Sequence, residues 1–94
     1  MYYQIRSFVA VYELESVSAA AKVVHLTQPA ITQHVRFLEN HFGRKLIERV
    51  SNKMVATPDG ERLYNAAKMF LEDHTRLENI FLSEENIKKI KFST

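Results

Sequence analysis

The chain has 94 residues, of which 46% are hydrophobic, and its 13 lysine and arginine residues outnumber 11 aspartate and glutamate residues. A chain of this length can build one modest core, so we expect one domain, alone or with an appendage. The absence of cysteine excludes a disulfide framework and a thiolate metal site. The longest stretch without a charged residue, 23–35, contains His, Thr and Gln, so the sequence predicts no membrane span. With no secretory signal apparent, we expect a cytoplasmic protein.

Positive charge is concentrated in one short segment. Residues 43–57 carry four basic side chains against one acidic, whereas residues 1–42 are neutral and residues 58–94 carry a net charge of −1. The basic residues of this segment are Arg44, Lys45, Arg49 and Lys53. A local basic patch is typical of a protein that meets a phosphate backbone. The alternative is a chance cluster of charges on a solvated hairpin.

Apolar residues recur with the period of an α-helix over residues 3–14, and they predict a first helix with one buried stripe. The stripe consists of Ile5, Phe8, Val9 and Tyr12. After the break at "ESVS", Ser18 is a suitable N-cap, so we expect a short second helix over residues 19–24. Ala20 and Ala21 are small, which lets another helix approach this one closely.

A third helix is predicted over residues 28–42. Thr27 is a good N-cap, and Pro29 lies in the first turn, where the lack of an N–H is harmless. The predicted buried stripe consists of Ile31, Val35, Leu38 and Phe42. Gly43 follows as a plausible C-terminal cap. The outer face of this helix is polar but carries almost no charge, which is unusual for a helix in contact with water.

The second and third helices, joined by a short turn, predict a helix-turn-helix. In that motif the second helix enters the major groove of DNA, where neutral amides and hydroxyls match the donors and acceptors of base edges. The candidate base-contacting residues are Gln28, Pro29, Thr32, Gln33 and Arg36. Thr27 is primarily a cap and is expected to contact the DNA backbone in addition, and His34 is expected at the edge of the groove, near the DNA backbone. The alternative is that these side chains are ordinary solvated residues.

Residues 45–57 are rich in β-forming residues and contain a polar "SN" at the centre, so they predict a two-stranded hairpin. Asn52 tolerates the positive φ that a tight turn requires. Arg49 and Lys53 flank this turn, and the tip is therefore expected to reach a phosphate or the adjacent minor groove.

Thr57 followed by Pro58 repeats the cap-and-proline pattern and predicts a long helix to about Leu82. Its heptad-like seam consists of Leu63, Ala67, Phe70, His74, Leu77 and Phe81. We expect this seam to pair with its copy in a homodimer, while Leu71 and Ile80 form a second apolar strip that can serve the domain itself. The alternative is that the helix folds back on the first helix. For His74, a polar contact that sets the dimer register and an outward orientation are both open.

A family resemblance follows from an ordered set of residues between positions 3 and 82. The matching residues are Ala20, Ala21, "TQPA" at 27–30, Thr32, "LE" at 38–39, Gly43, "LIER" at 46–49, Thr57 and Gly60. This set closely resembles the DNA-binding region of LysR-type bacterial transcription regulators. One departure is Asn52, because the family often has two basic residues at the tip of the wing.

The resemblance implies a mainly α fold, in which a winged helix-turn-helix domain at residues 1–57 precedes a long dimerisation helix at residues 58–82. It implies that residues 83–94 form a hinge and the start of an absent C-terminal domain that binds a small-molecule effector. In the family, residues matching Gln28, Pro29, Thr32 and Gln33 approach bases. Those matching Arg49 and Lys53 reach the backbone or the minor groove.

The partners that the resemblance implies are double-stranded DNA with a partly palindromic operator and a second copy of the chain. A tetramer of the full-length protein and contact with RNA polymerase are further expectations. No cofactor or metal is expected in this chain. Its four histidines are scattered and no Ser/His/Asp set or phosphate loop is visible, so we do not expect an enzyme. The alternatives are a winged-helix domain of the molybdate-responsive type and a helical dimer that binds protein.

Overall fold

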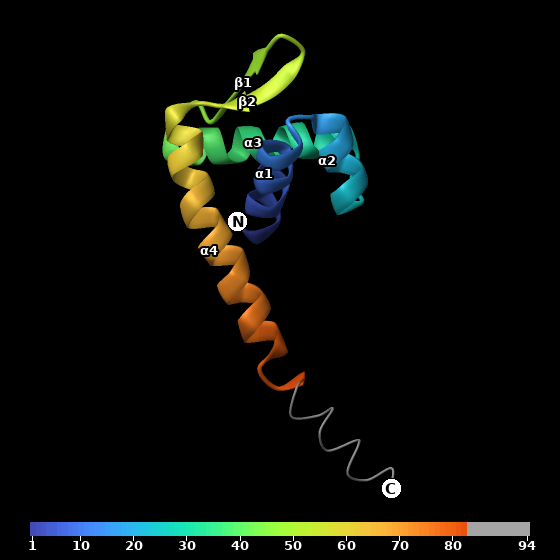
Figure 1. Cartoon of the computed structure of the whole chain (residues 1–94), viewed down its shortest axis with the longest axis vertical. Coiled ribbons are helices and arrows are strands. Elements are labelled where there is room, and N and C mark those ends of the chain that lie inside the picture. The colour runs from blue at the N-terminus through green and yellow to red at the C-terminus, as the bar shows by residue number, and fades with distance from the viewer. Residues whose placement is uncertain (83–94) are drawn as a thin grey trace, which may run out of the picture.

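The computed structural model describes residues 1–82, which form four helices and one β-hairpin (Figure 1). The elements in chain order are α1 (Tyr2–Leu14), α2 (Val17–Val24), α3 (Gln28–Phe42), β1 (Ile47–Val50), β2 (Lys53–Ala56) and α4 (Pro58–Asn79). The prediction of a mainly α fold with three helices, a hairpin and a long helix is confirmed. The predictions for residues 83–94 lie outside the described residues.

Helix α1 is the centre of the domain, because α2, α3 and α4 all pack against it. Its apolar stripe is buried as predicted, with Phe8 fully enclosed and Tyr12 partly buried. Ala20 lies in the core, where its small side chain allows the close packing expected of α2. From α3, Ile31 and Leu38 complete the interior. The core therefore fixes the orientation of the helix-turn-helix, and it leaves the opposite face of α3 exposed.

The start of α2 differs from the prediction. The N-cap is Ser16, whose hydroxyl accepts a hydrogen bond from the backbone N–H of Ala19 at 3.0 Å, so the helix begins at Val17 and not after Ser18. Ser16 has an extended backbone and follows Glu15, which adopts the left-handed conformation with φ 54°. That turn ends α1 abruptly and places the first helical residue of α2 two positions earlier than the sequence indicated.

Helix α3 has the predicted bounds and caps. The Thr27 hydroxyl accepts a hydrogen bond from the backbone N–H of Ala30 at 3.3 Å, and Gly43 ends the helix with φ 64°. The prediction that Phe42 is buried was wrong, because its side chain is 43% exposed and lies edge-on against His41. Leu46, four residues later, is buried at 2% and takes the interior place instead.

The hairpin is a two-stranded antiparallel sheet in which Val50 pairs with Lys53. The two turn residues, Ser51 and Asn52, both have positive φ, at 48° and 67°. This is the geometry that matches the twist of tight hairpins, and it confirms the predicted turn. The hairpin is attached to α1, because the backbone N–H of Met54 donates to the carbonyl oxygen of Glu15 at 3.0 Å.

The junction between the hairpin and α4 is closely packed. The hydroxyl of Thr57 caps α4 as predicted, accepting from the N–H of Gly60 at 3.0 Å. The N–H of Thr57 donates to the carbonyl oxygen of Leu46, also at 3.0 Å. A β-carbon on Gly60 would lie 2.0 Å from that same oxygen. Only glycine fits here, so the direction in which α4 leaves the wing is set by a backbone contact.

Helix α4 ends at Asn79 rather than at about Leu82, and only its first part packs on the domain before it projects away (Figure 1). Tyr64 stacks on Tyr12 of α1 with ring centroids 3.7 Å apart. The hydroxyl of Tyr64 donates to the carboxylate of Glu13, and this hydrogen bond raises the pKa of Tyr64 above its ordinary value of 10.0. None of the helices in the described part is long and apolar enough to cross a membrane.

The predicted heptad seam is divided by the structure. Ala67 is buried at 2% and Leu63 packs against the core of its own domain, as the fold-back alternative stated. Leu77 is 71% exposed, and Phe70 and Phe81 are also exposed. His74 does not turn outward, because its ring stacks on Tyr2 of α1 with centroids 4.0 Å apart. A polar contact of His74 across a dimer stays a prediction.

Candidate nucleic-acid interface

The face of α3 opposite the core presents the five predicted base-contacting residues together. Four of them are exposed and Thr32 is half-buried. Their spacing of one, three, one and three residues keeps them on one side of the helix. They are Gln28, Pro29, Thr32, Gln33 and Arg36. The inner stripe of α3 is held in the core, so this polar face cannot rotate away from solvent.

His34 does not share that face. Its Nδ1 lies 2.7 Å from the hydroxyl oxygen of Ser7 on α1, within hydrogen-bond distance, and Ser7 is 1% exposed. Because Nδ1 is engaged with α1, this nitrogen is not available to a phosphate. Ser7 was not among the predicted site residues, although its position in sequence, one polar residue directly before the apolar run "FVAV", was a usable signal. Thr27 is exposed and caps the helix beside the base-contacting face.

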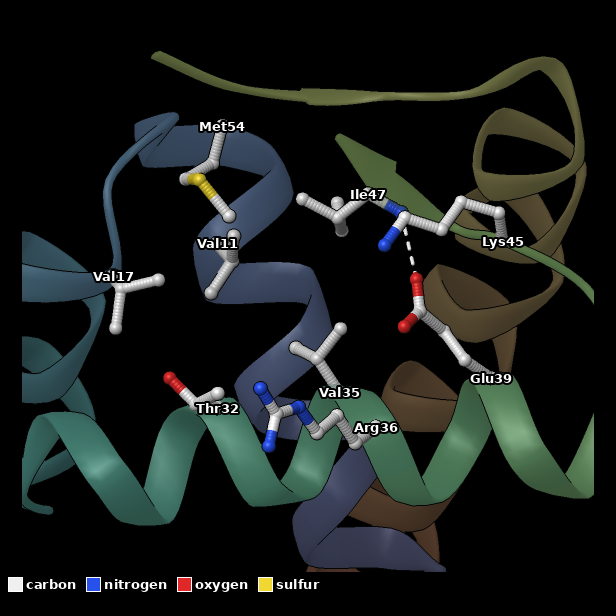
Figure 2. A pocket seen from close by; sticks show the side chains of 9 residues that line it. All are labelled: Val11, Val17, Thr32, Val35, Arg36, Glu39, Lys45, Ile47 and Met54. Atoms are coloured by element: carbon white, nitrogen blue, oxygen red, sulfur yellow. Dashed lines mark hydrogen bonds between the residues drawn. The ribbon is translucent and has the colours of Figure 1, made fainter. Parts of the chain in front are cut away.

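A hollow of 170 Å³ lies between α3, the start of α2 and the hairpin (Figure 2). Its apolar lining consists of Val11, Val17, Val35, Ile47 and Met54. Thr32 and Arg36 line it from α3, and Lys45 lines it from the segment before β1 (Figure 2). The predicted base-contacting face of α3 and the hairpin therefore border one concave surface.

The position of the hairpin beside α3 depends on Glu39, which the family resemblance includes but for which the sequence indicates no role. Its Oε2 accepts hydrogen bonds from the backbone N–H groups of Leu46 at 2.9 Å and Ile47 at 3.3 Å. Figure 2 shows the carboxylate of Glu39 pointing from α3 toward the start of β1. A residue of the predicted recognition helix thus fixes the first strand of the wing.

The four basic residues of the charged segment are all exposed but differ in their partners. Arg44 forms an ion pair with Asp59 at 3.4 Å, and Lys53 lies 4.0 Å from the carboxylate of Glu15. Within residues 1–82, Lys45 and Arg49 form no ion pair, and neither does Arg36 on α3. Of the basic residues on α3 and in the charged segment, these three therefore carry positive charge that no carboxylate within residues 1–82 pairs with.

Arg49 and Lys53 are both exposed near the tip, but they lie on opposite faces of the hairpin. Arg49 is directly opposite Met54 in the register, whereas Lys53 is opposite Val50. Directly opposed residues share a face and successive residues alternate. Arg49 therefore lies on the same face of the hairpin as Met54, which lines the hollow. Asn52 lies in the turn that connects β1 to β2. Across residues 1–82 there is no group of His, Cys, Asp and Glu that could hold a metal ion.

Three helices around one core, a two-stranded wing and an exposed polar face on the second helix of a helix-turn-helix define a winged helix-turn-helix protein. The sequence pattern of the family described as "Bacterial regulatory helix-turn-helix protein, lysR family" matches residues 2–61. The chain belongs to this family, as its sequence features indicated. The family assignment places the chain among regulators, not enzymes, and it supports the LysR type over the molybdate-responsive type.

One relative in sequence is the HTH-type transcriptional regulator DgcR of Pseudoalteromonas sp. It is 32% identical over 88 residues, which are 94% of this chain and 29% of the relative. The chain thus spans less than a third of the length of that relative.

Two solved structures of DNA complexes have the same fold. The DNA-binding domain of CbnR bound to DNA is 30% identical, with a TM-score of 0.81 over 90% of this chain and 98% of that one. The DNA-binding domain of BenM bound to catB site 1 DNA is 29% identical, with a TM-score of 0.82 over 88% of this chain and 92% of that one. Both likenesses therefore extend over most of the chain.

Proposed function

We propose that this chain binds double-stranded DNA in a sequence-specific manner, as the N-terminal part of a dimeric LysR-type transcription regulator. The observation that carries the proposal is the neutral, exposed face of α3 beside a basic wing. Neutral amides and hydroxyls suit base edges, while positive charges suit phosphates, and the two kinds of side chain occupy adjacent surfaces here. The likeness to two DNA-bound domains supports the same conclusion.

Each residue of the face has a chemical role in this proposal. Gln28 and Gln33 can each form two hydrogen bonds with an adenine, and Thr32 can place its methyl group near that of thymine. Arg36 borders the hollow and can take a guanine or a phosphate. Arg49 can reach the backbone or the minor groove from the wing. Pro29 offers an apolar surface without an unpaired N–H.

The dimer is part of the proposal. The distal half of the predicted seam stays exposed in the single chain, with Leu77 at 71% and Phe81 at 69%. Large apolar side chains at heptad spacing on a projecting helix are typical of a helix that pairs with its copy. A twofold dimer presents two recognition helices, so we expect a partly palindromic operator. A tetramer of the full-length regulator and contact with RNA polymerase extend this proposal.

The effector belongs to the part of a longer regulator that lies outside this chain. We expect a small molecule to bind a C-terminal domain of that longer regulator. The chain spans only 29% of the length of DgcR, which leaves ample length for such a domain in that relative. No cofactor is assigned to the described residues.

Selection of bound sequences from random duplex DNA tests the proposal most directly. We expect two related half-sites at a spacing of whole helical turns, and we expect the affinity for the selected duplex to fall steeply between ~50 and ~200 mM salt. The variant Gln28→Ala/Gln33→Ala is the matched control, because it alters the face of α3 and keeps every charge. Selection of no sequence above background, together with salt-independent binding, would contradict DNA binding and favour a protein partner.

A further inference from the structure

The residue between α1 and the cap of α2 has an unusual backbone. Glu15 adopts φ 54° and ψ 30°, the left-handed conformation, and its N–H donates to the carbonyl oxygen of Val11. Glycine is the residue that adopts this conformation without steric cost. A glutamate in this conformation therefore costs some folding free energy relative to glycine. It also adds a negative charge that the turn does not require.

Glu15 contacts the wing in two ways. Its carbonyl oxygen accepts the hydrogen bond from the N–H of Met54 at 3.0 Å, and its Oε1 lies 4.0 Å from the Nζ of Lys53. The side chains of Glu15 and Lys53 are 45% and 67% exposed. An exposed ion pair of this kind contributes little to folding stability. The backbone contact already attaches the wing, so the carboxylate is not needed for that purpose.

This ion pair lies at the edge of the proposed DNA-binding surface. The carbonyl oxygen of Glu15 accepts from the N–H of Met54, which lines the same hollow as Thr32 and Arg36 of α3. The side chain of Lys53 flanks this hollow from the other face of the hairpin. A duplex that contacts the face of α3 and the wing therefore brings phosphates close to this pair. A carboxylate in that place repels phosphates and also occupies the lysine that would bind one.

We propose that Glu15 competes with DNA for Lys53. Its carboxylate forms an ion pair with Lys53, and a DNA phosphate must displace this carboxylate in order to bind the lysine. This inference rests on the proposed DNA-binding function. The competition concerns only contacts with the phosphate backbone of DNA, so it lowers the affinity for all duplexes by the same factor. The preference among sequences is left to α3. It also reduces the number of counterions released, because Lys53 is already neutralised within the protein.

The test compares Glu15→Gln, Lys53→Gln, the double variant and Glu72→Gln by fluorescence anisotropy on a selected duplex and an unrelated duplex. Glu72 is exposed on the projecting part of α4, so its variant makes the same charge change away from the wing. We expect Glu15→Gln to bind both duplexes about two- to fivefold more tightly at low salt, the range of an exposed ion pair. The slope of log K against log salt should steepen by about one unit.

In the Lys53→Gln background the gain from Glu15→Gln should shrink to the small part that direct repulsion of phosphates contributes, because the competition acts through the lysine. An unchanged affinity and slope for Glu15→Gln would overturn the inference, and so would an equal gain in the Lys53→Gln background. Glu72→Gln should leave the affinity unchanged, and a gain as large as that of Glu15→Gln would also contradict it. Failure of the parent protein to bind any duplex would instead refute the proposed function.

Discussion

The Oε2 atom of Glu39 lies 2.9 Å from the backbone nitrogen of Leu46, and this bond connects α3 to the first strand of the wing. Glu39 projects from the same helix as the predicted base-contacting residues, and it lines the hollow together with Thr32 and Arg36. The two proposed DNA-binding elements are therefore held at a fixed distance from each other by one carboxylate. That arrangement makes the geometry of the wing dependent on α3 itself.

Replacing Glu39 with alanine should destabilise the domain by about 1.5–3 kcal/mol, because two backbone N–H groups lose a charged acceptor. Glu39→Gln should cost less, since its amide oxygen can still accept. Urea denaturation followed by circular dichroism measures both values. Equal stability of Glu39→Ala and the parent protein would show that solvent replaces the carboxylate without loss.

Gly60→Ala should lower the free energy of unfolding by about 1–3 kcal/mol, the range of overpacked sites. The new β-carbon would lie 2.0 Å from the carbonyl oxygen of Leu46. Elsewhere in a helix the same substitution usually stabilises, so the sign of the change is diagnostic. The control is Gly43→Asn, where nothing lies within 4 Å and asparagine tolerates the φ of 64°. Thermal denaturation of both variants provides the comparison.

Gln33→Ala should reduce the preference for one base by about 1–3 kcal/mol, because an exposed amide on α3 is lost without any change in charge. Arg49→Ala should instead weaken binding to all sequences and reduce the salt slope by about one unit. Competition binding with single-base variants of the selected duplex distinguishes these two outcomes. A uniform loss for Gln33→Ala would reassign it to positioning the protein on the backbone.

Leu77→Asp should dissociate the proposed dimer, since Leu77 is 71% exposed on the projecting part of α4 and a carboxylate there cannot be buried in a helix pair. It is a cleaner probe than Phe70, which also lies near Tyr2 of its own domain. Thr75→Asp places the same charge on another side of the helix and should leave the dimer intact. Analytical ultracentrifugation reports the result, and a monomeric parent protein would refute the dimer.

Alkaline titration should reveal the hydrogen bond between Tyr64 and Glu13. The raised pKa of Tyr64 means that folding favours the protonated phenol. Its contribution to stability is therefore present below the ordinary pKa of 10.0 and is lost as the pH rises through the higher folded value. Absorbance at 295 nm should show that the phenol of Tyr64 ionises at a higher pH than a free tyrosine, and Glu13→Gln should reduce this difference in pH. An identical titration curve for that variant would exclude the carboxylate as the cause.

The elements of the fold could be predicted wherever local chemistry decides them. Thr27 and Thr57 are followed by proline at the start of long apolar repeats, so both helix starts were correct. The turn at Asn52 was correct for a similar reason. Ser18 was a wrong cap because Ser16 fits equally well by composition. The choice between them depends on the backbone of Glu15, which no pattern of residue types reports.

Contacts between elements were beyond the sequence. The role of Glu39 depends on how closely the chain returns to α3 after Gly43, which is a property of the whole fold. The bond between Ser7 and His34 joins residues 27 positions apart. The heptad seam of α4 was visible as a repeat, but the repeat could not show that Ala67 faces its own core while Leu77 remains exposed.

The stack of Tyr2 on His74 is the most distal aromatic contact between α1 and α4 in the described chain, and the side chains of residues 75–79 are exposed. The domain therefore finishes its own packing about three quarters of the way along α4. Foreign heptads could be spliced in from residue 75 onward without disturbing the core. The length of the inserted helix would then set the distance between two such domains in an engineered fusion. The same length would set the spacing of the sites that the two domains occupy.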